Sequence, residues 1–376
     1  MKKFKMGFIL TTQLGNSTRF AVLKKYAERD SEVECVWAPI EYNPKLSKLI
    51  RMARKLPDAL YWRIVVMYEA SVVLRHFRLF DAIMIHQFEP SVVLSIARYF
   101  SRLPALVSST DDTPLMQIRN HPMYANELRR SDFLQRLRLR LDLWRVRRAD
   151  LSIPMSQWAA SILVDLCGVE ASTVYPIHVG LDLESWPRVA PRGAKPAGMK
   201  KLLFVGGDFE RKGGPMLLRV HQEHFSERAE LHLVTKHVLG GAYRNVTLYS
   251  DLNPLDARLK ALYSECDIFV LPTNSDVSSW VALEAHASSL PVVITNVGGI
   301  ADIVEDQHTG LLIDKGDEQA LIRAIEMLLD DPQKCMQFGE NGRKWVEERF
   351  NAETNVRRIM DLMKVASRPR SGAASG

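Results

Sequence analysis

The chain has 376 residues, of which 47% are hydrophobic and 25% charged, and its formal net charge is +6. This composition excludes a chain that is disordered throughout and is typical of a globular protein with two domains; only the end, SRPRSGAASG, is expected to be disordered. The apolar run after the N-terminal lysines is too short for a signal peptide and predicts a first strand.

Short apolar runs alternate with helix-period segments from one end of the chain to the other. Strands are predicted in the first half at Met6–Leu10, Val33–Trp37, Ala82–Ile85, Ala105–Val107, Leu151–Ile153 and Thr173–Tyr175. Strands are predicted in the second half at Leu202–Val205, Leu231–Val234, Val246–Leu248, Ile268–Leu271, Val292–Ile294 and Leu311–Ile313. This alternation predicts an α/β fold with parallel sheets that helices cover on both faces.

A proline- and glycine-rich stretch, residues 184–200, separates the two halves and is predicted to be a linker. We therefore expect two Rossmann-like, doubly wound domains, at 1–183 and 201–350, facing each other across a cleft. Residues 351–376 are expected to hold a C-terminal helix, a candidate for packing back on the first domain, and a flexible tail.

Charge is distributed unevenly between the halves. Residues 1–180 contain 26 Lys and Arg against 17 Asp and Glu, whereas the remaining residues contain 24 against 27. A basic first half indicates either an anionic partner, such as a membrane surface or a phosphorylated acceptor, or simply a solvated surface. Cysteines are few and scattered, with no metal-binding spacing, so we expect no metal and a cytoplasmic location.

Two basic stretches in the first half carry much of this excess. Residues 127–148 predict an amphipathic basic helix with one apolar stripe (Phe133, Leu137, Leu141 and Trp144) and arginines, including Arg145, on the remaining faces. Residues 45–63 form a second basic stretch. Docking on the inner face of a membrane fits both, and so does an ordinary helix that packs on its own sheet. No nucleic-acid-binding motif is present.

The first segment that carries chemistry is residues 202–220, LLFVGGDFERKGGPMLLRV. A buried strand is followed by Gly206 and Gly207, then by Arg211 and Lys212, and then by a glycine pair that opens a helix. Backbone N–H groups at a helix start, glycines that allow close approach and two cations suit a diphosphate. An ordinary strand-to-helix turn with surface cations has the same pattern.

The second segment, residues 268–299, places two acids eight residues apart around a helix start. Glu284 lies in an apolar helix, where a carboxylate needs a partner, and a ribose diol is a suitable one. Asp276, in the preceding loop, suits the hydroxyls of a sugar. The alternatives are that Glu284 is a solvated helix residue and that Asp276 is an N-cap.

Together, these segments resemble the donor-binding half of retaining glycosyltransferases with the GT-B fold, family 4 (glycosyl transferases group 1) in particular. The resemblance rests on Arg211-Lys212-Gly213, on Asp276 to Glu284 followed by Ala285, and on Pro291-Val292-Val293. Residues 298–317, 149–163 and 174–186, with Gly180 and Asp182, extend it from about 149 to 350. Before residue 149 the similarity is weak.

The resemblance implies a role for each matching position. Lys212 and Arg211 would hold the diphosphate of a nucleotide sugar, with UDP or GDP as the expected nucleotide, Glu284 would hold the ribose, and Asp276 would contact the donor sugar. The implied catalytic set is Asp276, Lys212 and Arg211, and the implied donor-binding set is Gly15, Gly206, Gly207, Arg211, Lys212, Ser278, Ser279, Trp280 and Glu284. No metal or cofactor is implied, and the acceptor would be a glycan or a lipid-linked molecule of cell-surface polysaccharide, lipopolysaccharide or glycolipid synthesis.

Several positions depart from the family pattern. The first carboxylate is Asp276 rather than Glu, and Val277-Ser278-Ser279 stands where the family has Gly-Phe-Gly. Thr110-Asp111 stands where the family often has His-Asp, and His86 is interpreted as a strand-end residue or a group near the cleft. These departures keep open a catalytically silent nucleotide-binding scaffold. A nucleotide-sugar epimerase is a further alternative, although no ordered match to one is found.

Overall fold

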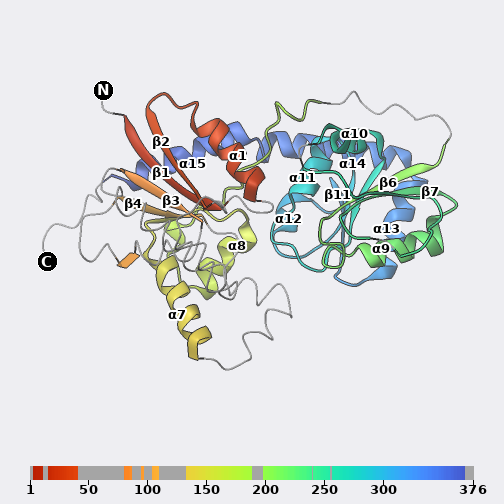
Figure 1. Cartoon of the computed structure of the whole chain (residues 1–376), viewed down its shortest axis with the longest axis horizontal. Coiled ribbons are helices and arrows are strands. Elements are labelled where there is room, and N and C mark those ends of the chain that lie inside the picture. Colours follow the sequence, from red (N-terminus) through yellow and green to blue (C-terminus); the bar gives the residue numbers. More distant parts are fainter. Residues whose placement is uncertain are drawn as a thin grey trace, which may run out of the picture. The chain divides into compact units, whose positions relative to one another are not determined.

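The computed structural model describes residues 3–11, 16–40, 80–86, 95–96, 104–109, 133–188, 198–238, 240–254 and 256–368. The chain divides into two compact units (Figure 1). Unit 1 is built mainly from Met1–Ile118, Met123–Val179 and Ala352–Gly376, and unit 2 mainly from Gly180–Asn351. The two α/β units with parallel sheets confirm the predicted Rossmann-like fold class.

Unit 1 contains a parallel sheet in the order β2-β1-β3-β4-β5. Its strands are β1 (Phe4–Thr11), β2 (Val33–Ile40), β3 (Ala82–Ile85), β4 (Ala105–Ser108) and β5 (Leu151–Ser152). Among its described residues, the helices are α1 (Asn16–Ala27), α7 (Phe133–Arg148), α8 (Gln157–Ser161), which a π-helical turn at Ile162–Leu166 continues, and α15 (Ala352–Ala366). The order reverses between β1 and β3, the switch point where ligands bind in sheets of this kind.

The C-terminal helix α15 packs against α1 and against the sheet of unit 1. Lys364 on α15 donates to Asp30 at 2.8 Å, and Asn355 donates to the carbonyl of His178 at 2.9 Å. Its apolar face, which includes Val356, Ile359 and Met363, is almost fully buried. Burial of this face is what holds the end of the chain in unit 1.

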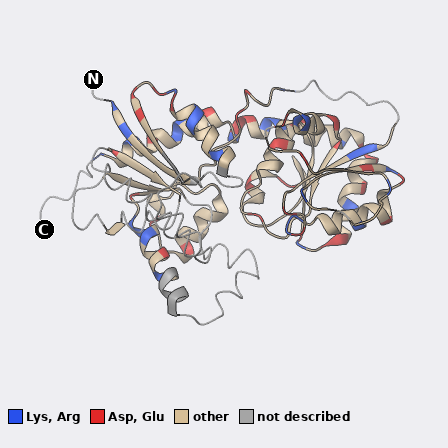
Figure 2. Cartoon of the chain, in the orientation of Figure 1, with Lys and Arg blue, Asp and Glu red and all other residues tan. Residues whose placement is uncertain are grey.

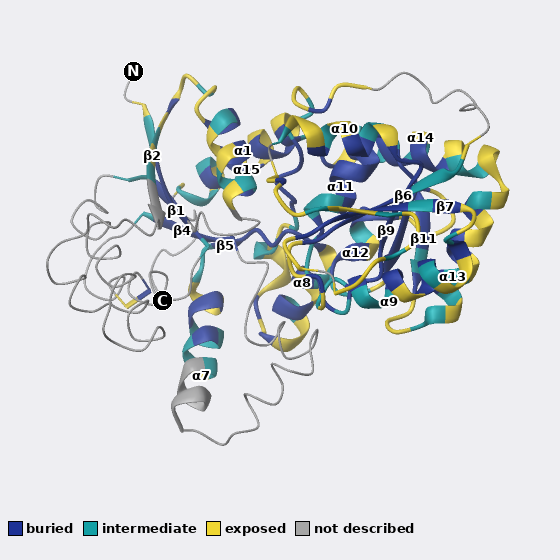
Figure 3. Cartoon of the chain, turned by 45° about the vertical axis from the view of Figure 1, so that its right-hand side comes forward, coloured by how far each residue is buried: buried dark blue, intermediate teal, exposed yellow. Residues whose placement is uncertain are grey.

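Unit 2 contains a six-stranded parallel sheet in the order β11-β10-β9-β6-β7-β8. Its strands are β6 (Lys200–Val205), β7 (Ala229–Val234), β8 (Val246–Tyr249), β9 (Ile268–Leu271), β10 (Val292–Thr295) and β11 (Gly310–Ile313). Its helices are α9 (Gly214–Val220), with a π-helical turn at His221–Phe225, α10 (Ala257–Glu265), α11 (Trp280–Ala287), α12 (Ile300–Ile303), α13 (Glu318–Asp330) and α14 (Pro332–Arg349). Strands β6, β9 and β10 are buried along most of their length (Figure 3), as expected of parallel strands covered on both faces.

Aspartate residues cap the N-termini of three helices of unit 2. The carboxylates of Asp256, Asp317 and Asp331 accept hydrogen bonds from backbone N–H groups in the first turns of α10, α13 and α14. Each such cap satisfies one N–H group that would otherwise lack a partner. These local signals fix where the helices begin, and so fix the lengths of the loops that follow the strands.

One strand predicted in unit 1 is wrong, and one arginine of the basic helix is buried. Thr173–Tyr175 is not a strand: Ala171–Thr173 is a 3₁₀ turn, and Val174 makes a single bridge to Ser152, because β5 has only two residues to pair with. Arg145 does not lie on a solvated face of α7. It is 4% exposed and pairs with the buried carboxylate of Asp142 at 2.5 Å.

The basic helix itself is present. Helix α7 spans Phe133–Arg148, and basic residues are spread along its described part (Figure 2). Arg147 and Arg148 at its end are exposed. Val146 is buried and Trp144 is half-buried, so this end of the helix packs on its own unit. Residues 127–132, the basic stretch 45–63, residues 189–197 of the predicted linker and the tail from 369 lie outside the described residues. Within the described residues, no helix has the length and apolar character needed to cross a membrane.

Candidate functional site

The predicted site residues of unit 2 follow two neighbouring strands, β6 and β9. These strands pair in parallel, with Leu202 opposite Ile268 and Leu203 opposite Phe269. From β6 the chain builds β7 and β8 on one side, and β9, β10 and β11 on the other. The chain therefore leaves β6 and β9 in opposite directions along the sheet, and the loops after these two strands flank the switch point, where ligands bind in sheets of this kind.

Hydrogen bonds join these two loops. The Asn274 N–H donates to the Arg211 carbonyl at 2.8 Å, and the Asn274 side chain donates to the Glu210 carbonyl at 3.1 Å. The Arg211 guanidinium donates to the Ser275 carbonyl at 2.7 Å and to the Asp208 carboxylate at 3.1 Å. Arg211 thus holds the two loops together, and part of its donor capacity is already in use.

Glycines allow the loops to come this close. Gly213 has a φ of +79°, and a Cβ atom there would lie 1.9 Å from the Pro272 carbonyl oxygen. A Cβ on Gly206 would press on the Lys212 side chain at 3.0 Å, whereas a Cβ on Gly207 would have nothing within 4 Å. Packing therefore requires glycine at 213, but the open space beside Gly207 leaves room for a ligand.

Gly213→Ala is expected to lower the free energy of unfolding by roughly 1–3 kcal/mol, because alanine is strained at this φ and its methyl group meets a carbonyl oxygen. Gly207→Ala, the matched control, should leave stability nearly unchanged. Denaturant unfolding of both variants measures the difference. Equal stabilities of the two variants would contradict the packing argument.

Lys212 and Asp276 meet where the two loops come together. The Lys212 ammonium forms an ion pair with the Asp276 carboxylate, and the side chains are only 13% and 9% exposed. At such low exposure each charge needs the other, because solvent screens them little. The pair places one cation and one carboxylate next to each other at the switch point of the sheet.

Glu284 lies one helix turn inside α11 and is 6% exposed. Its Oε2 accepts a hydrogen bond from the Tyr263 hydroxyl at 2.8 Å. Burial raises the pKa of Glu284 to about 7, and the Tyr263 hydrogen bond and the charge of Lys260 oppose that rise. The alternative interpretation of Glu284 as a solvated helix residue is therefore wrong.

The remaining predicted residues surround the start of α11. Ser279 is the N-cap residue of the helix, so the alternative interpretation of Asp276 as its N-cap is wrong. The Ser279 hydroxyl is buried and, within the described residues, has no hydrogen-bond partner. Ser278 and Trp280, on either side, are half-buried. An unpaired hydroxyl at a helix N-terminus is suited to an acceptor oxygen of a bound anion.

In unit 1, His86 lies at the end of β3, next to the switch point. Its Nδ1 lies 2.8 Å from Arg19 Nη1 on α1 and 2.6 Å from the Ser109 carbonyl oxygen after β4. These contacts fit the strand-end interpretation. Gly15 and Thr110-Asp111 lie outside the described residues, so the prediction for Gly15 stays a prediction.

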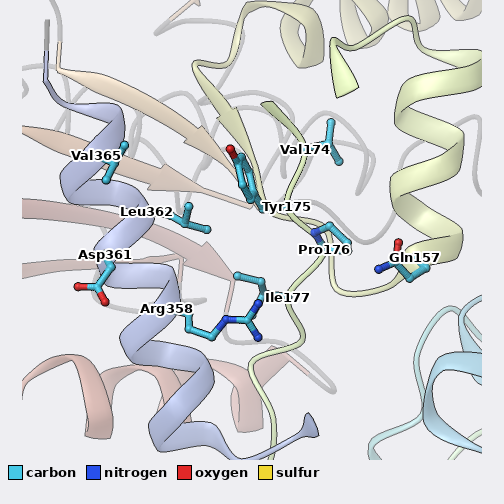
Figure 4. A pocket seen from close by; sticks show the side chains of 9 residues that line it. All are labelled: Gln157, Val174, Tyr175, Pro176, Ile177, Arg358, Asp361, Leu362 and Val365. Atoms are coloured by element: carbon cyan, nitrogen blue, oxygen red, sulfur yellow. The ribbon is translucent and has the colours of Figure 1, made fainter. Parts of the chain in front are cut away.

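A cavity of about 470 Å³ lies elsewhere in unit 1, between the 174–177 segment and α15 (Figure 4). Tyr175, Ile177 and Leu362 give it an apolar wall, and Arg358 and Asp361 lie at its side. None of the predicted site residues lines it. Within the described part of the chain, no cluster of three His, Cys, Asp or Glu side chains could hold a metal ion.

Several residues that shape the site were not predicted. Tyr263, which holds Glu284, precedes it by 21 residues and lies on a different helix, and Asp208 and Asn274 act through loop contacts. Such long-range contacts leave no periodic signal in the sequence. The one available signal was the need of a buried carboxylate for a partner.

Residues 240–345 match the protein family described as Glycosyl transferases group 1. The chain is 32% identical over 222 residues to D-inositol 3-phosphate glycosyltransferase 2 of Catenulispora acidiphila, a match that covers 52% of each chain. It thus spans about half the length of the curated relatives it matches, or less.

Solved structures extend the similarity to the whole fold. Sucrose-phosphate synthase of Thermosynechococcus elongatus is similar with a TM-score of 0.74 and 19% identity, covering 96% of this chain and 99% of that one. Alr3699/HepE of Anabaena, solved in complex with UDP-glucose, has a TM-score of 0.69 and 18% identity with the same coverage. At these identities the similarity shows the fold.

Proposed function

We propose that this chain, whose residues 240–345 match the glycosyl transferases group 1 family, transfers a sugar from a nucleotide-diphosphate sugar to a hydroxyl acceptor. The observation that carries the proposal is the meeting of Lys212 and Asp276 at the β6/β9 switch point, beside the start of the helix that holds Glu284. One small region thus combines a cation, a sugar-binding carboxylate and a buried acceptor for hydroxyl groups. We further propose that the protein belongs to family 4 and retains the anomeric configuration.

Each side chain has a role in this proposal. Lys212 binds the diphosphate and neutralises the charge that develops on it when the bond from the anomeric carbon breaks. Arg211 holds the two loops together and so keeps Lys212 in place. The start of α11 contacts the diphosphate through Ser278, Ser279 and Trp280. Glu284 accepts the ribose hydroxyl protons, and Asp276 faces the donor sugar. Gly206 and Gly207 leave space for the donor, and the family resemblance alone supports Gly15 as a further donor-binding residue.

The reaction proposed is a front-face displacement. The bond from the anomeric carbon to the diphosphate oxygen breaks, and a bond to the acceptor oxygen forms on the same face. The acceptor proton passes to the departing phosphate oxygen. Fixed cations and helix N–H groups take the role that a divalent ion has in other transferases, so we propose a metal-independent enzyme.

UDP or GDP is the proposed nucleotide. Support for UDP comes from Anabaena HepE, whose similar fold was solved with UDP-glucose. For the acceptor we propose a glycan or a lipid-linked molecule of polysaccharide, lipopolysaccharide or glycolipid synthesis, bound through the basic unit 1. The exposed arginines at the end of α7 support peripheral contact with the inner face of a membrane.

Incubation with a panel of UDP-, GDP- and ADP-sugars, with and without acceptors, tests the proposal. We expect release of nucleotide diphosphate from one donor class, with the sugar appearing on water or on the acceptor, and no release by Glu284→Ala. Lys344→Ala, which changes an exposed lysine on α14, is the matched control and should be as active as the unchanged chain. Binding without release would indicate a silent scaffold, and an altered donor sugar that stays on its nucleotide would indicate an epimerase.

A further inference from the structure

Among the described residues, Tyr263 is the largest of the fully buried side chains. Its ring is 0% exposed; it packs edge-on against Trp186 at 5.5 Å and is stacked against Phe269 at 6.1 Å between ring centres. These contacts leave the ring no freedom to turn. The direction of its hydroxyl is therefore set by the core of unit 2, independently of any ligand.

The hydroxyl has two acceptors within reach, and the distances favour one. The Glu284 Oε2 lies at 2.8 Å, and the Val281 carbonyl oxygen at 3.4 Å. A phenol has a single proton to donate, and a carboxylate is the stronger acceptor. Within the described residues this is the one hydrogen bond to the Glu284 carboxylate, so Oε2 is occupied and Oε1 remains available.

We propose that Tyr263 is a positioning residue, which holds the Glu284 carboxylate so that its second oxygen accepts a ribose hydroxyl, and thereby sets a preference for ribonucleotides over 2′-deoxyribonucleotides. The inference rests on the proposed function, because it takes Glu284 as the ribose-binding group. It goes further by assigning the residue that makes this recognition selective. A carboxylate fixed on one side rejects a nucleotide without the matching hydroxyl, because its free oxygen is then left unpaired.

Two interactions favour the ionised carboxyl group that this role needs, and they oppose the larger effect of burial. On α10, one turn before Tyr263, Lys260 donates to the Ser185 carbonyl at 2.9 Å and lies 5.2 Å above the Trp186 ring. The Lys260 charge and the Tyr263 hydroxyl both lower the pKa of Glu284 against the effect of burial.

Helix α14, which packs on α11, contributes one buried charge to this region. Arg343 donates to the carbonyls of Trp186 and Ala287, each at 2.6 Å, and to Glu347 at 2.8 Å. His286, two residues after Glu284 on α11, is buried and its pKa is lowered to about 4, so it is neutral near pH 7. Removing the Tyr263 hydroxyl removes one of the two interactions that lower the pKa of Glu284 against burial.

Tyr263→Phe in the full chain tests the inference by calorimetric binding of UDP and 2′-deoxy-UDP, or of the GDP pair where GDP is the nucleotide bound, between pH 5.5 and 8.5. The unchanged chain is expected to prefer the ribonucleotide by about tenfold or more, with affinity rising through pH 7 as Glu284 loses its proton. In Tyr263→Phe, the preference for the ribonucleotide should fall to about threefold or less. The pH at which the affinity reaches half of its rise should move upward. Tyr249→Phe is the matched control, because it removes a hydroxyl that bonds His232 at 3.0 Å in the same unit.

Two further measurements keep the inference testable. In a Glu284→Gln background, Tyr263→Phe should have little additional effect, because both changes act on the same contact. If Tyr263→Phe fails to fold, 3-fluorotyrosine at position 263 keeps the shape and donates more strongly, so the pH midpoint should move downward instead.

The outcomes separate the two proposals. An unchanged chain that binds no nucleotide diphosphate overturns the proposed function. If the unchanged chain prefers the ribonucleotide and Tyr263→Phe has the same preference and the same pH midpoint, the role of Tyr263 is overturned and the proposed function stands. A lower melting temperature with unaltered preference would show that the hydroxyl is only structural.

Discussion

Lys212→Ala is expected to lower kcat/KM for the nucleotide-sugar donor by about 10²–10³-fold, the loss found when one fixed donor to a developing negative charge is removed. Two effects act in the same direction. The change removes the cation that would bind the diphosphate, and it takes the Lys212 charge away from the Asp276 carboxylate, which is 9% exposed. A donor would then meet an unscreened negative charge where a neutralised one had been.

Controls distinguish these two effects. Lys344→Ala removes an exposed lysine on α14 and should leave kcat/KM unchanged within about twofold, since an isolated exposed charge contributes little. Adding Asp276→Asn to Lys212→Ala should restore part of the affinity for free UDP or GDP, because the repulsion is gone, but should not restore turnover. Donor turnover that stays near the unchanged value in Lys212→Ala would exclude Lys212 from the diphosphate site.

The architecture was predictable because buried parallel strands are short apolar runs, and such runs stand out between helical segments. Val292–Ile294, for example, lies within β10 (Val292–Thr295), and Ile268–Leu271 is β9 itself. The prediction was wrong at Thr173–Tyr175, where the apolar run is present but the neighbouring strand has only two residues for it to pair with. Local composition shows that a segment suits a strand, and only the fold shows whether a partner strand is available.

The candidate site was predictable only in part, for a related reason. Lys212 and Asp276 follow two separate strands, and the sequence cannot show that these strands are neighbours, although the order of the sheet makes their loops adjacent. Arg145 shows the opposite case: in the sequence it is one of many arginines on a basic helix, but the structure buries it against Asp142. A charge pattern alone does not tell a solvated cation from a buried, paired one.

Glu284→Gln is expected to reduce the pH dependence of the stability of unit 2. The pKa of Glu284 is about 7 in the folded chain, against an ordinary value of 4.5. Between these values the folded chain keeps a proton that the unfolded chain has released, so the folded state binds more protons. Raising the pH from 4.5 to 7 therefore lowers the free energy of unfolding, by up to about 3 kcal/mol for this group.

Hydrogen exchange of the buried amides of β9 and α11, measured without nucleotide, checks this in the unit concerned. The difference in stability between the unchanged chain and Glu284→Gln should change by up to about 3 kcal/mol as the pH rises from 4.5 through 7, with the carboxyl form losing stability, and should be constant above about pH 8. Glu347→Gln is the control, because Arg188 holds the pKa of Glu347 at about 2. The difference in stability between the unchanged chain and Glu347→Gln should therefore not change with pH above about pH 5.5. A flat difference for Glu284→Gln would mean that the Glu284 carboxyl is ionised throughout this range.

Bound nucleotide should oppose this loss of stability, because hydroxyl groups that donate to the carboxylate favour its ionised form and lower its pKa. Stability measured with saturating UDP or GDP should therefore fall less between pH 4.5 and 7 than stability measured without it, and the gain from nucleotide should increase with pH. A gain that does not depend on pH would mean that the nucleotide does not contact Glu284. Because burial raises the pKa of Glu284, the pH dependence of stability reports on this carboxyl group. It therefore shows whether a bound nucleotide contacts Glu284, as we propose for the ribose.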